Sequence, residues 1–142
     1  MLRNRISWIN VNKKLRDEIL RKLKQYANDR ENIKILVLYG SILRRDFIRD
    51  VDVAVFVRED KEDLLYLEFR IEEELERILR IPVDVRVINR APPWFIKKVL
   101  KEGLILKGKE VAIALYKKAL DEIEGLRIKR KLYTTQTVGK MF

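Results

Sequence analysis

The stretch that decides the fold reads Ile33-Lys-Ile-Leu-Val-Leu-Tyr39-Gly40-Ser41 and, after eight further residues, Asp50-Val-Asp52-Val-Ala-Val-Phe-Val57. Residues 33–39 are rich in β-branched and large apolar side chains and end at a glycine, which predicts a strand. Residues 51–57 carry valine at every odd position, which predicts a second strand with one buried face. These two strands and the loop between them form the centre of the predicted fold.

Helical and strand patterns flank this centre. Apolar residues at helical spacing predict helices over 11–28, from an N-cap at Asp60 to about 79, from Pro93 to about 102, and from 111 to about 126 with an interruption at Gly125. Residues 83–88 repeat the valine pattern of a strand, 104–106 add a short fourth strand, and the polar tail from Thr134 is expected to be loose. The predicted class is therefore α/β (α+β), with a small mixed sheet of three to four strands and helices packed on it.

The length of 142 residues predicts a single domain over 1–142, with a core at about 33–108 and a basic helical extension at about 109–142. A hydrophobic content of 47% is typical of a globular protein. No apolar run approaches the ~20 residues of a membrane span, and the first residues lack the apolar core of a signal peptide. We therefore expect a cytoplasmic protein without a membrane partner.

Two residue types are missing from the chain. Cysteine and histidine are both absent, which excludes disulfides, thiol chemistry, histidine-ligated zinc and an imidazole base. Catalysis would have to use carboxylates, hydroxyls, lysine, arginine or a hard cation. The absence of cysteine and the 38% of charged residues are typical of a thermophile.

The charge is high and uneven. The net charge is +10, and the positive excess lies in residues 1–32 and 97–142 on either side of a slightly acidic middle. This excess either serves solubility and thermal adaptation or attracts a nucleotide, nucleic acid or acidic partner. The basic residues near the C-terminus could contact RNA phosphates or simply form a solvated helix end: Arg127, Lys129, Arg130 and Lys131.

Carboxylates within the strands are the candidate chemical groups. Asp50 and Asp52 stand two residues apart, so in an extended chain they point to the same side with Cα atoms roughly 7 Å apart. Asp84 interrupts the third strand in the same way. Oxygen ligands of this kind suit Mg²⁺. The alternative is that each is an ordinary exposed or ion-paired aspartate, with Arg86 as a partner of Asp84.

Gly40-Ser41 follows the first strand directly. A glycine lets the backbone approach a ligand closely, and a following turn can direct N–H groups and the serine hydroxyl toward phosphate. The alternative is a simple strand-ending turn. A P-loop is excluded because the chain has no Gly-x-x-x-x-Gly-Lys-Ser/Thr string.

The combined pattern resembles the signature of the DNA polymerase beta-like nucleotidyltransferase superfamily, and most of all its minimal nucleotidyltransferases. The resemblance covers about residues 33–108 and rests on these matches: Leu38-Tyr39-Gly40-Ser41, Arg44, Asp46-Phe47, Asp50-Val51-Asp52, Val83-Asp84-Val85, Ala91-Pro92 and Glu102-Gly103. Two departures stand in the loop: eight residues instead of about ten separate Ser41 from Asp50, and Arg45 replaces a glycine. The loop is therefore expected to be shorter and stiffer, which bears on substrate handling.

The resemblance implies an enzyme with two Mg²⁺ ions and ATP or another nucleoside triphosphate as substrate. It assigns Asp50 and Asp52 to the metal on the triphosphate, and Asp84 to a second metal and to deprotonation of the attacking hydroxyl. Gly40 and Ser41 would bind the β and γ phosphates. Three loop arginines either neutralise phosphate charge or lie in solvent: Arg44, Arg45 and Arg49. Pyrophosphate would leave as the nucleoside monophosphate is transferred.

The resemblance also implies a partner. Minimal nucleotidyltransferases often act as antitoxins beside a HEPN ribonuclease toxin, and some transfer AMP to a tyrosine of that toxin. Two alternatives remain: a binding module that has kept the fold with weak or lost catalysis, and a basic RNA-binding protein whose Asp-x-Asp is coincidental. The valine-rich strands require that a sheet edge be covered, which a toxin or a dimer could do.

Overall fold

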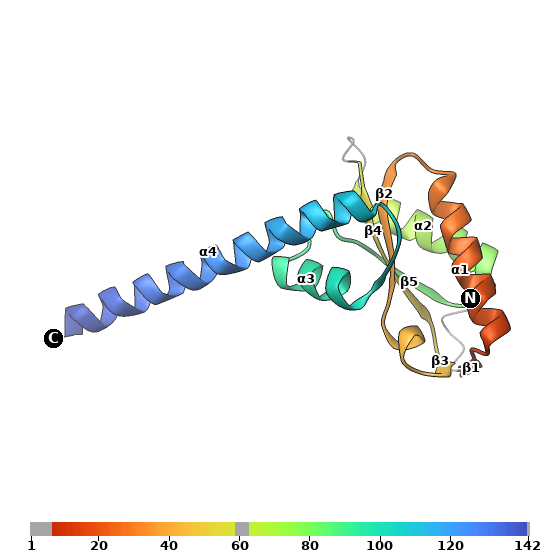
Figure 1. Ribbon diagram of the computed structural model, residues 1–142, viewed down its shortest axis with the longest axis horizontal. Coiled ribbons are helices and arrows are strands. Elements are labelled where there is room, and N and C mark those ends of the chain that lie inside the picture. Colours follow the sequence, from red (N-terminus) through yellow and green to blue (C-terminus); the bar gives the residue numbers. More distant parts are fainter. Residues whose placement is uncertain (1–6, 59–62, 142) are drawn as a thin grey trace.

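The computed structural model describes residues 7–58 and 63–141, and in these residues a four-stranded sheet separates two pairs of helices (Figure 1). The strands lie in the order β5 (Val83–Val87), β4 (Val51–Val57), β2 (Ile33–Tyr39), β6 (Leu104–Lys107). Strand β2 is antiparallel to both of its neighbours, whereas β4 and β5 are parallel. The predicted small mixed sheet is confirmed.

The helices cover both faces of the sheet. Helices α1 (Lys13–Asn28) and α2 (Leu64–Leu79) pack on one face, and α3 (Pro93–Glu102) and α4 (Lys109–Met141) pack on the other (Figure 1). Along β2 the buried side chains alternate between the two cores, so that Leu36 and Leu38 face α1 and α2 while Ile35 and Val37 face α3 and α4. Burial on both faces explains why this strand is apolar almost throughout.

Polar side chains cap the N-termini of α1 and α2. The Asn12 side chain accepts a hydrogen bond from the backbone N–H of Leu15 (2.8 Å), and the Asp63 side chain accepts one from Leu65 (3.0 Å). The predicted cap Asp60 lies outside the described residues, and the cap of α2 in the structure is Asp63. Helix α3 begins at Pro93, as predicted.

Helix α4 corrects the prediction for the C-terminal segment. It runs without a break from Lys109 to Met141, so neither the interruption at Gly125 nor the loose tail from Thr134 is observed. A single glycine costs a helix only about 1 kcal/mol relative to alanine, which a long helix tolerates. The hydroxyls of Thr134 and Thr135 donate hydrogen bonds to the backbone carbonyls four residues earlier, at 2.9 Å each. Both polar side chains therefore find hydrogen-bond partners within the helix.

A two-stranded ribbon outside the main sheet was not predicted. Strands β1 (Ile9–Asn10) and β3 (Phe47–Ile48) pair antiparallel, and the N–H of Val11 donates to the carbonyl of Asp46 (2.6 Å). Two-residue strands are too short for a sequence period to reveal them. The ribbon ties the N-terminal segment to the loop between β2 and β4, which also contains the short 3₁₀ helix η2 (Ser41–Leu43).

The β5 edge of the sheet is closed by side chains of α2. Three glutamates spaced four residues apart accept hydrogen bonds from backbone N–H groups of β5: Glu76 from Val83 (3.1 Å), Glu72 from Val85 (3.1 Å) and Glu68 from Val87 (2.9 Å). These carboxylates occupy the positions that another strand would need for pairing. In the described part of the chain, no helix has the length and apolarity that a membrane span requires.

Candidate active site

Strand alternation brings two of the predicted carboxylates together. In the parallel pair β4–β5, Asp52 is the register partner of Asp84, and in the antiparallel pair β2–β4 it is the partner of Tyr39. The neighbouring valines Val53 and Val85 belong to the core under α1 and α2. Both aspartates therefore project from the opposite face of the sheet, which α3 covers.

Gly40 makes room for one of these carboxylates. Its φ of +85° is a backbone conformation that favours glycine, and a Cβ built at this position would overlap Oδ2 of Asp52. The Cγ and Cβ atoms of Asp52 would lie 3.1 and 3.2 Å from that Cβ. Glycine is favoured at this position both by the positive φ and by the lack of room for a side chain beside Asp52. A simple turn at the end of a strand would explain only the first of these two features.

A cavity of about 600 Å³ opens beside Asp52. The volume is typical of sites for nucleotide-sized ligands. The β2–β4 segment contributes Tyr39, Gly40, Ser41, Leu43, Arg44 and Asp52 to its wall, and α3 contributes Phe95, Lys98, Val99 and Glu102. The cavity therefore joins the Gly-Ser turn, the two carboxylates Asp52 and Glu102, and one cationic residue from each side.

Negative charge is concentrated at this end of the sheet. Burial, followed by the charges of Asp50 and Asp84, raises the pKa of Asp52 to about 6, and Arg86 acts in the opposite direction. Burial, followed by the charges of Asp52, Asp84 and Asp50, also raises the pKa of the Tyr39 phenol, with Arg86 acting in the opposite direction. The Arg86 Nε lies 3.7 Å from Oδ1 of Asp84, an ion pair that offsets part of the repulsion.

The carboxylates fit a divalent cation that the substrate helps to hold. Among residues 7–58 and 63–141, no three acidic side chains form a complete metal cage by themselves. Mg²⁺ is commonly bound by one or two carboxylates together with substrate phosphates. A cation next to Asp52 would relieve the repulsion from Asp50 and Asp84, so these three aspartates are the candidate ligands.

The three loop arginines, Arg44, Arg45 and Arg49, lie in different surroundings. Arg44 lines the cavity with Asp52, whereas Arg45 lines a second hollow with Trp8 and Phe47 near the β1–β3 ribbon. The guanidinium carbon of Arg49 lies 4.7 Å from the ring centroid of Trp8, in a cation–π contact. The structure places only Arg44 of these three in the wall of the cavity, and phosphate binding by any of the three stays a prediction.

The contribution of α3 to the cavity was not predicted. Phe95, Lys98, Val99 and Glu102 share one face of that helix at spacings of three and four residues. This period was present in the sequence, but nothing local indicates that the face turns toward Gly40.

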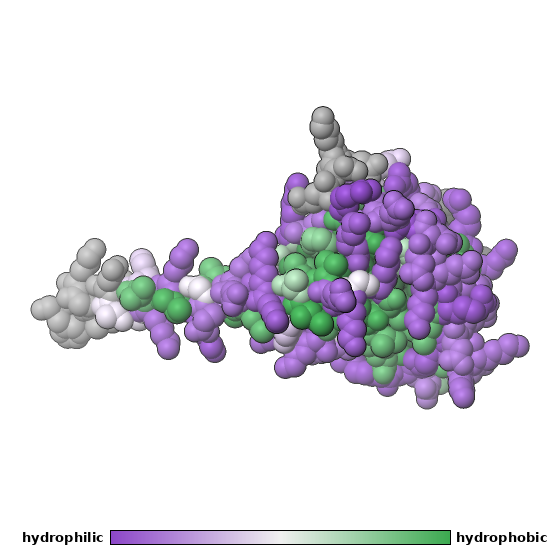
Figure 2. Space-filling model, turned by 45° about the horizontal axis from the view of Figure 1, so that its top comes forward, coloured by the Kyte–Doolittle hydropathy of each residue, from purple (hydrophilic) through white to green (hydrophobic). Residues whose placement is uncertain are grey.

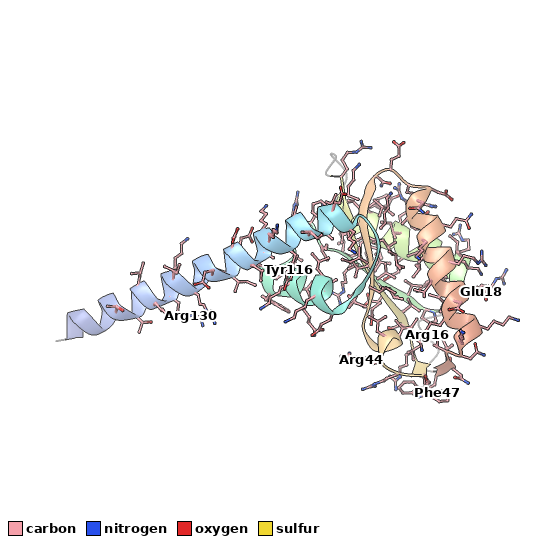
Figure 3. The ribbon with its side chains drawn as sticks, in the orientation of Figure 1. Arg16, Glu18, Arg44, Phe47, Tyr116 and Arg130 are labelled. Carbon is pink, nitrogen blue, oxygen red and sulfur yellow. The ribbon has the colours of Figure 1, made fainter. Side chains whose placement is uncertain are left out.

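Arg16 supports the Gly-Ser turn from outside the cavity. Its guanidinium donates hydrogen bonds to the carbonyl of Ile42 and, at 3.3 Å, to that of Arg45. Figure 3 shows Arg16 on α1 at the end of the molecule where Arg44 and Phe47 lie. At separations of 26 and 29 residues, no sequence pattern predicts this support.

Comparison with known proteins agrees with this geometry. The family model described as "Polymerase beta, Nucleotidyltransferase" matches residues 21–112. Two proteins of Methanocaldococcus jannaschii, which carry provisional names as protein adenylyltransferases, are similar to this chain. One is 33% identical over 92 residues and the other 32% identical over 90 residues; each alignment covers 62% of this chain and 90% of the relative.

Solved structures with this fold include a chain from the tri-AMPylated Shewanella oneidensis HEPN toxin in complex with the MNT antitoxin. That chain matches with a TM-score of 0.65 and 17% identity, over 87% of this chain and 98% of its own length. A chain of the toxin–antitoxin complex MntA–HepT matches with a TM-score of 0.63 and 16% identity, over 86% and 98% of the two chains. The matched family region contains the Gly-Ser turn and all three aspartates, and the chain belongs to the polymerase beta nucleotidyltransferase family, as a nucleotidyltransferase.

Proposed function

We propose that this protein is a Mg²⁺-dependent adenylyltransferase that transfers AMP from ATP to a hydroxyl group of a partner protein, and that it acts in this way as the antitoxin of a HEPN toxin. The observation that carries the proposal is the position of Asp52, which lines the cavity beside Gly40 and lies close enough to Asp50 and Asp84 for their charges to act on it. A carboxylate that can hold a cation and a turn that can bind phosphate therefore line one ligand-sized space.

The residues would act in the following roles. Asp50 and Asp52 would hold the cation against the triphosphate, and Asp84 would accept the proton of the attacking hydroxyl. The bound cation supplies stabilisation of charge on the attacking and leaving oxygens. Ser41 and the backbone at Gly40 would bind the β and γ phosphates, with Arg44 and Lys98 of the cavity wall neutralising their charge. A bond forms between the acceptor oxygen and the α phosphorus, the bond to the β-phosphate oxygen breaks, and pyrophosphate leaves.

The names of the similar proteins support the nucleotide and the acceptor. The Methanocaldococcus jannaschii relatives are named for adenylyl transfer to protein. The matched toxin–antitoxin structures include one with an AMPylated toxin and one with AMP-PNP. Chemistry of this type depends mainly on positioning and electrostatics, so a chain without histidine can perform it.

Transfer of radiolabel from α-labelled ATP to a co-purified toxin tests the proposal. We expect Mg²⁺-dependent labelling that Asp52→Asn lowers by at least a factor of about 100, since the carboxylate ligand is lost. Asp17→Asn, on the exposed side of α1, makes the same chemical change away from the cavity and should label normally. Wild-type labelling by a folded Asp52→Asn protein would contradict the proposal.

A binding module with weak or lost catalysis is the second candidate. The observation that favours it is the short loop, in which Arg45 lines a second hollow with Trp8 and not the cavity beside Asp52. Such a module would neutralise its partner equally well with Asp50→Asn or Asp52→Asn, and no nucleoside triphosphate would label the partner. Loss of neutralisation in both variants, with the complex still intact, would exclude this alternative.

A further inference from the structure

Helix α4 carries a surface that no other described part of the chain covers. Its second half projects away from the sheet (Figure 1), and apolar residues alternate with charged ones along the projection (Figure 2). The exposed fraction is 59% for Leu126 and 72% for Tyr133. Large apolar side chains exposed along an isolated helix indicate a contact with another molecule.

The charge order along this helix reverses at Gly125. Asp121, Glu122 and Glu124 precede the glycine, and the basic residues follow it: Arg127, Lys129, Arg130 and Lys131. A second α4 lying parallel would place like charges side by side. A second α4 lying antiparallel, with a two-fold axis between residues 125 and 126, would place each acidic segment against a basic one. A two-fold contact of this kind uses the same surface on both copies.

One face of the helix carries the matching pairs. Residues spaced by three, four or seven positions share a helix face. The residues that share it are all exposed, and we call them the α4 stripe: Lys118, Glu122, Gly125, Leu126, Lys129 and Tyr133. The two-fold axis would set Glu122 opposite Lys129 of the second copy, twice by symmetry. It would also set Leu126 opposite Gly125 of the second copy.

Among the described residues, nothing else explains the glycine and the two charges. A Cβ at Gly125 would have no atom within 4 Å, although glycine is among the least favourable residues in a helix interior. The Arg127–Glu124 pair (3.5 Å) lies within the helix, whereas among the described residues no ion pair involves Glu122 or Lys129. A missing side chain lets two helices approach closely where they cross.

From these observations we propose that the α4 stripe is a self-docking surface, on which α4 of a second copy of this chain lies antiparallel across Gly125. A crossing of two single helices is smaller than a standard stable interface, so the dimer should be weak and reversible. This contact would form whether or not the protein has the proposed catalytic function.

Sedimentation equilibrium of the full chain tests the proposal with a charge swap. We expect a dimer for the wild type, and a dimer Kd at least tenfold higher for Glu122→Lys and for Lys129→Glu, because each brings like charges together. These two variants change the net charge in opposite directions, so a general charge effect would move their Kd values in opposite directions. The double variant, Glu122→Lys with Lys129→Glu, should restore the wild-type Kd within about threefold.

Lys131→Glu is the matched control, because it makes the same change on the opposite face of α4 and should leave the Kd within about threefold of wild type. Circular dichroism would show that each variant keeps its helix content. A wild type that stays monomeric at 200 μM would overturn the proposal and leave the surface for a different partner. Failure of the double variant to restore the dimer would overturn it as well.

Discussion

The carboxylate of Asp52 fills the space that a side chain at Gly40 would need. Gly40 follows the end of β2 and Asp52 lies near the start of β4, 12 positions later in the sequence, yet both residues line the same cavity. The Gly-Ser turn and the Asp-x-Asp pair are therefore one structural unit, and a change in either should affect the other.

Gly40→Ala should lower both stability and nucleotide transfer. The alanine would stand at a φ of +85° and its Cβ would displace the Asp52 carboxylate. We expect a loss of about 1–3 kcal/mol in the free energy of unfolding by urea denaturation, and at least a tenfold loss of transfer. In an Asp52→Ala background the overlap is absent, so the same glycine change should cost less. Equal costs in both backgrounds would show that Asp52 does not set the requirement.

Asp52 should make stability depend on pH. Its pKa of about 6 lies above the value of about 3.9 expected in the unfolded chain. The ionised carboxylate is therefore unfavourable in the folded protein, a penalty that is complete above pH 6 and vanishes as the pH falls toward 4. We expect Asp52→Asn to raise the free energy of unfolding by about 1–2 kcal/mol at pH 7 and to leave it unchanged at pH 4.

Urea denaturation at both pH values measures this difference, and added Mg²⁺ together with ATP supplies a second readout. Mg–ATP should stabilise the wild type more than the variant, because the variant lacks one of the candidate carboxylate ligands. A gain in stability that is the same at pH 4 and pH 7 would disprove the electrostatic origin.

Arg16→Ala should loosen the Gly-Ser turn from a distance. The guanidinium holds the carbonyls of Ile42 and Arg45, and its loss leaves both without this donor. We expect a drop of about 1–3 kcal/mol in unfolding free energy and weaker nucleotide binding. Arg16→Lys should recover only part of the loss, since an ammonium group lacks the planar fork of guanidinium. Arg21→Ala, on the exposed side of α1, is the control and should change stability by less than about 0.5 kcal/mol.

Lys98→Ala should weaken the binding of ATP in the cavity. Lys98 lines the same cavity as the Gly-Ser turn, so its ammonium can pair with the phosphate oxygens of a bound nucleotide. We expect the Kd of Mg–ATP by calorimetry to rise by roughly tenfold, the loss of one charge-assisted hydrogen bond. Lys101 follows on the same helix, is exposed and is not part of the wall, so Lys101→Ala should bind as wild type. Equal effects of the two changes would point to general charge rather than contact.

Glu72→Ala should expose the edge of β5. The N–H of Val85, next to Asp84, would lose its acceptor. We expect about 1–2 kcal/mol less unfolding free energy and faster hydrogen exchange at Val85, while Val83 and Val87 keep their own glutamates. Glu72→Gln retains an amide oxygen as acceptor and should protect Val85 nearly as well. Unchanged exchange at Val85 in Glu72→Ala would show that the hydrogen bond contributes nothing.

Short-range sequence patterns alone were enough to predict the main strands and helices. The strands at 33–39 and 51–57, the end of α2 at Leu79 and the start of α3 at Pro93 agree with the structure. Their signals are alternating valines, apolar residues at helical spacing and proline, all of which act within a few residues. The interrupted strands also identified Asp52 and Asp84 as candidates, because a carboxylate in an apolar strand needs a cause.

Only the tertiary structure decided what stands around those carboxylates. In the structure, Lys98 and Glu102 of α3 line the same cavity as Gly40 and Arg44. Arg49 instead contacts the ring of Trp8, and α4 continues without a break through Gly125. Each of these features depends on contacts between segments far apart in the sequence or on the total length of a helix. A sequence pattern of a few residues contains neither kind of information. The sequence by itself determined which residues could do chemistry, and packing across the sheet determined which of them meet.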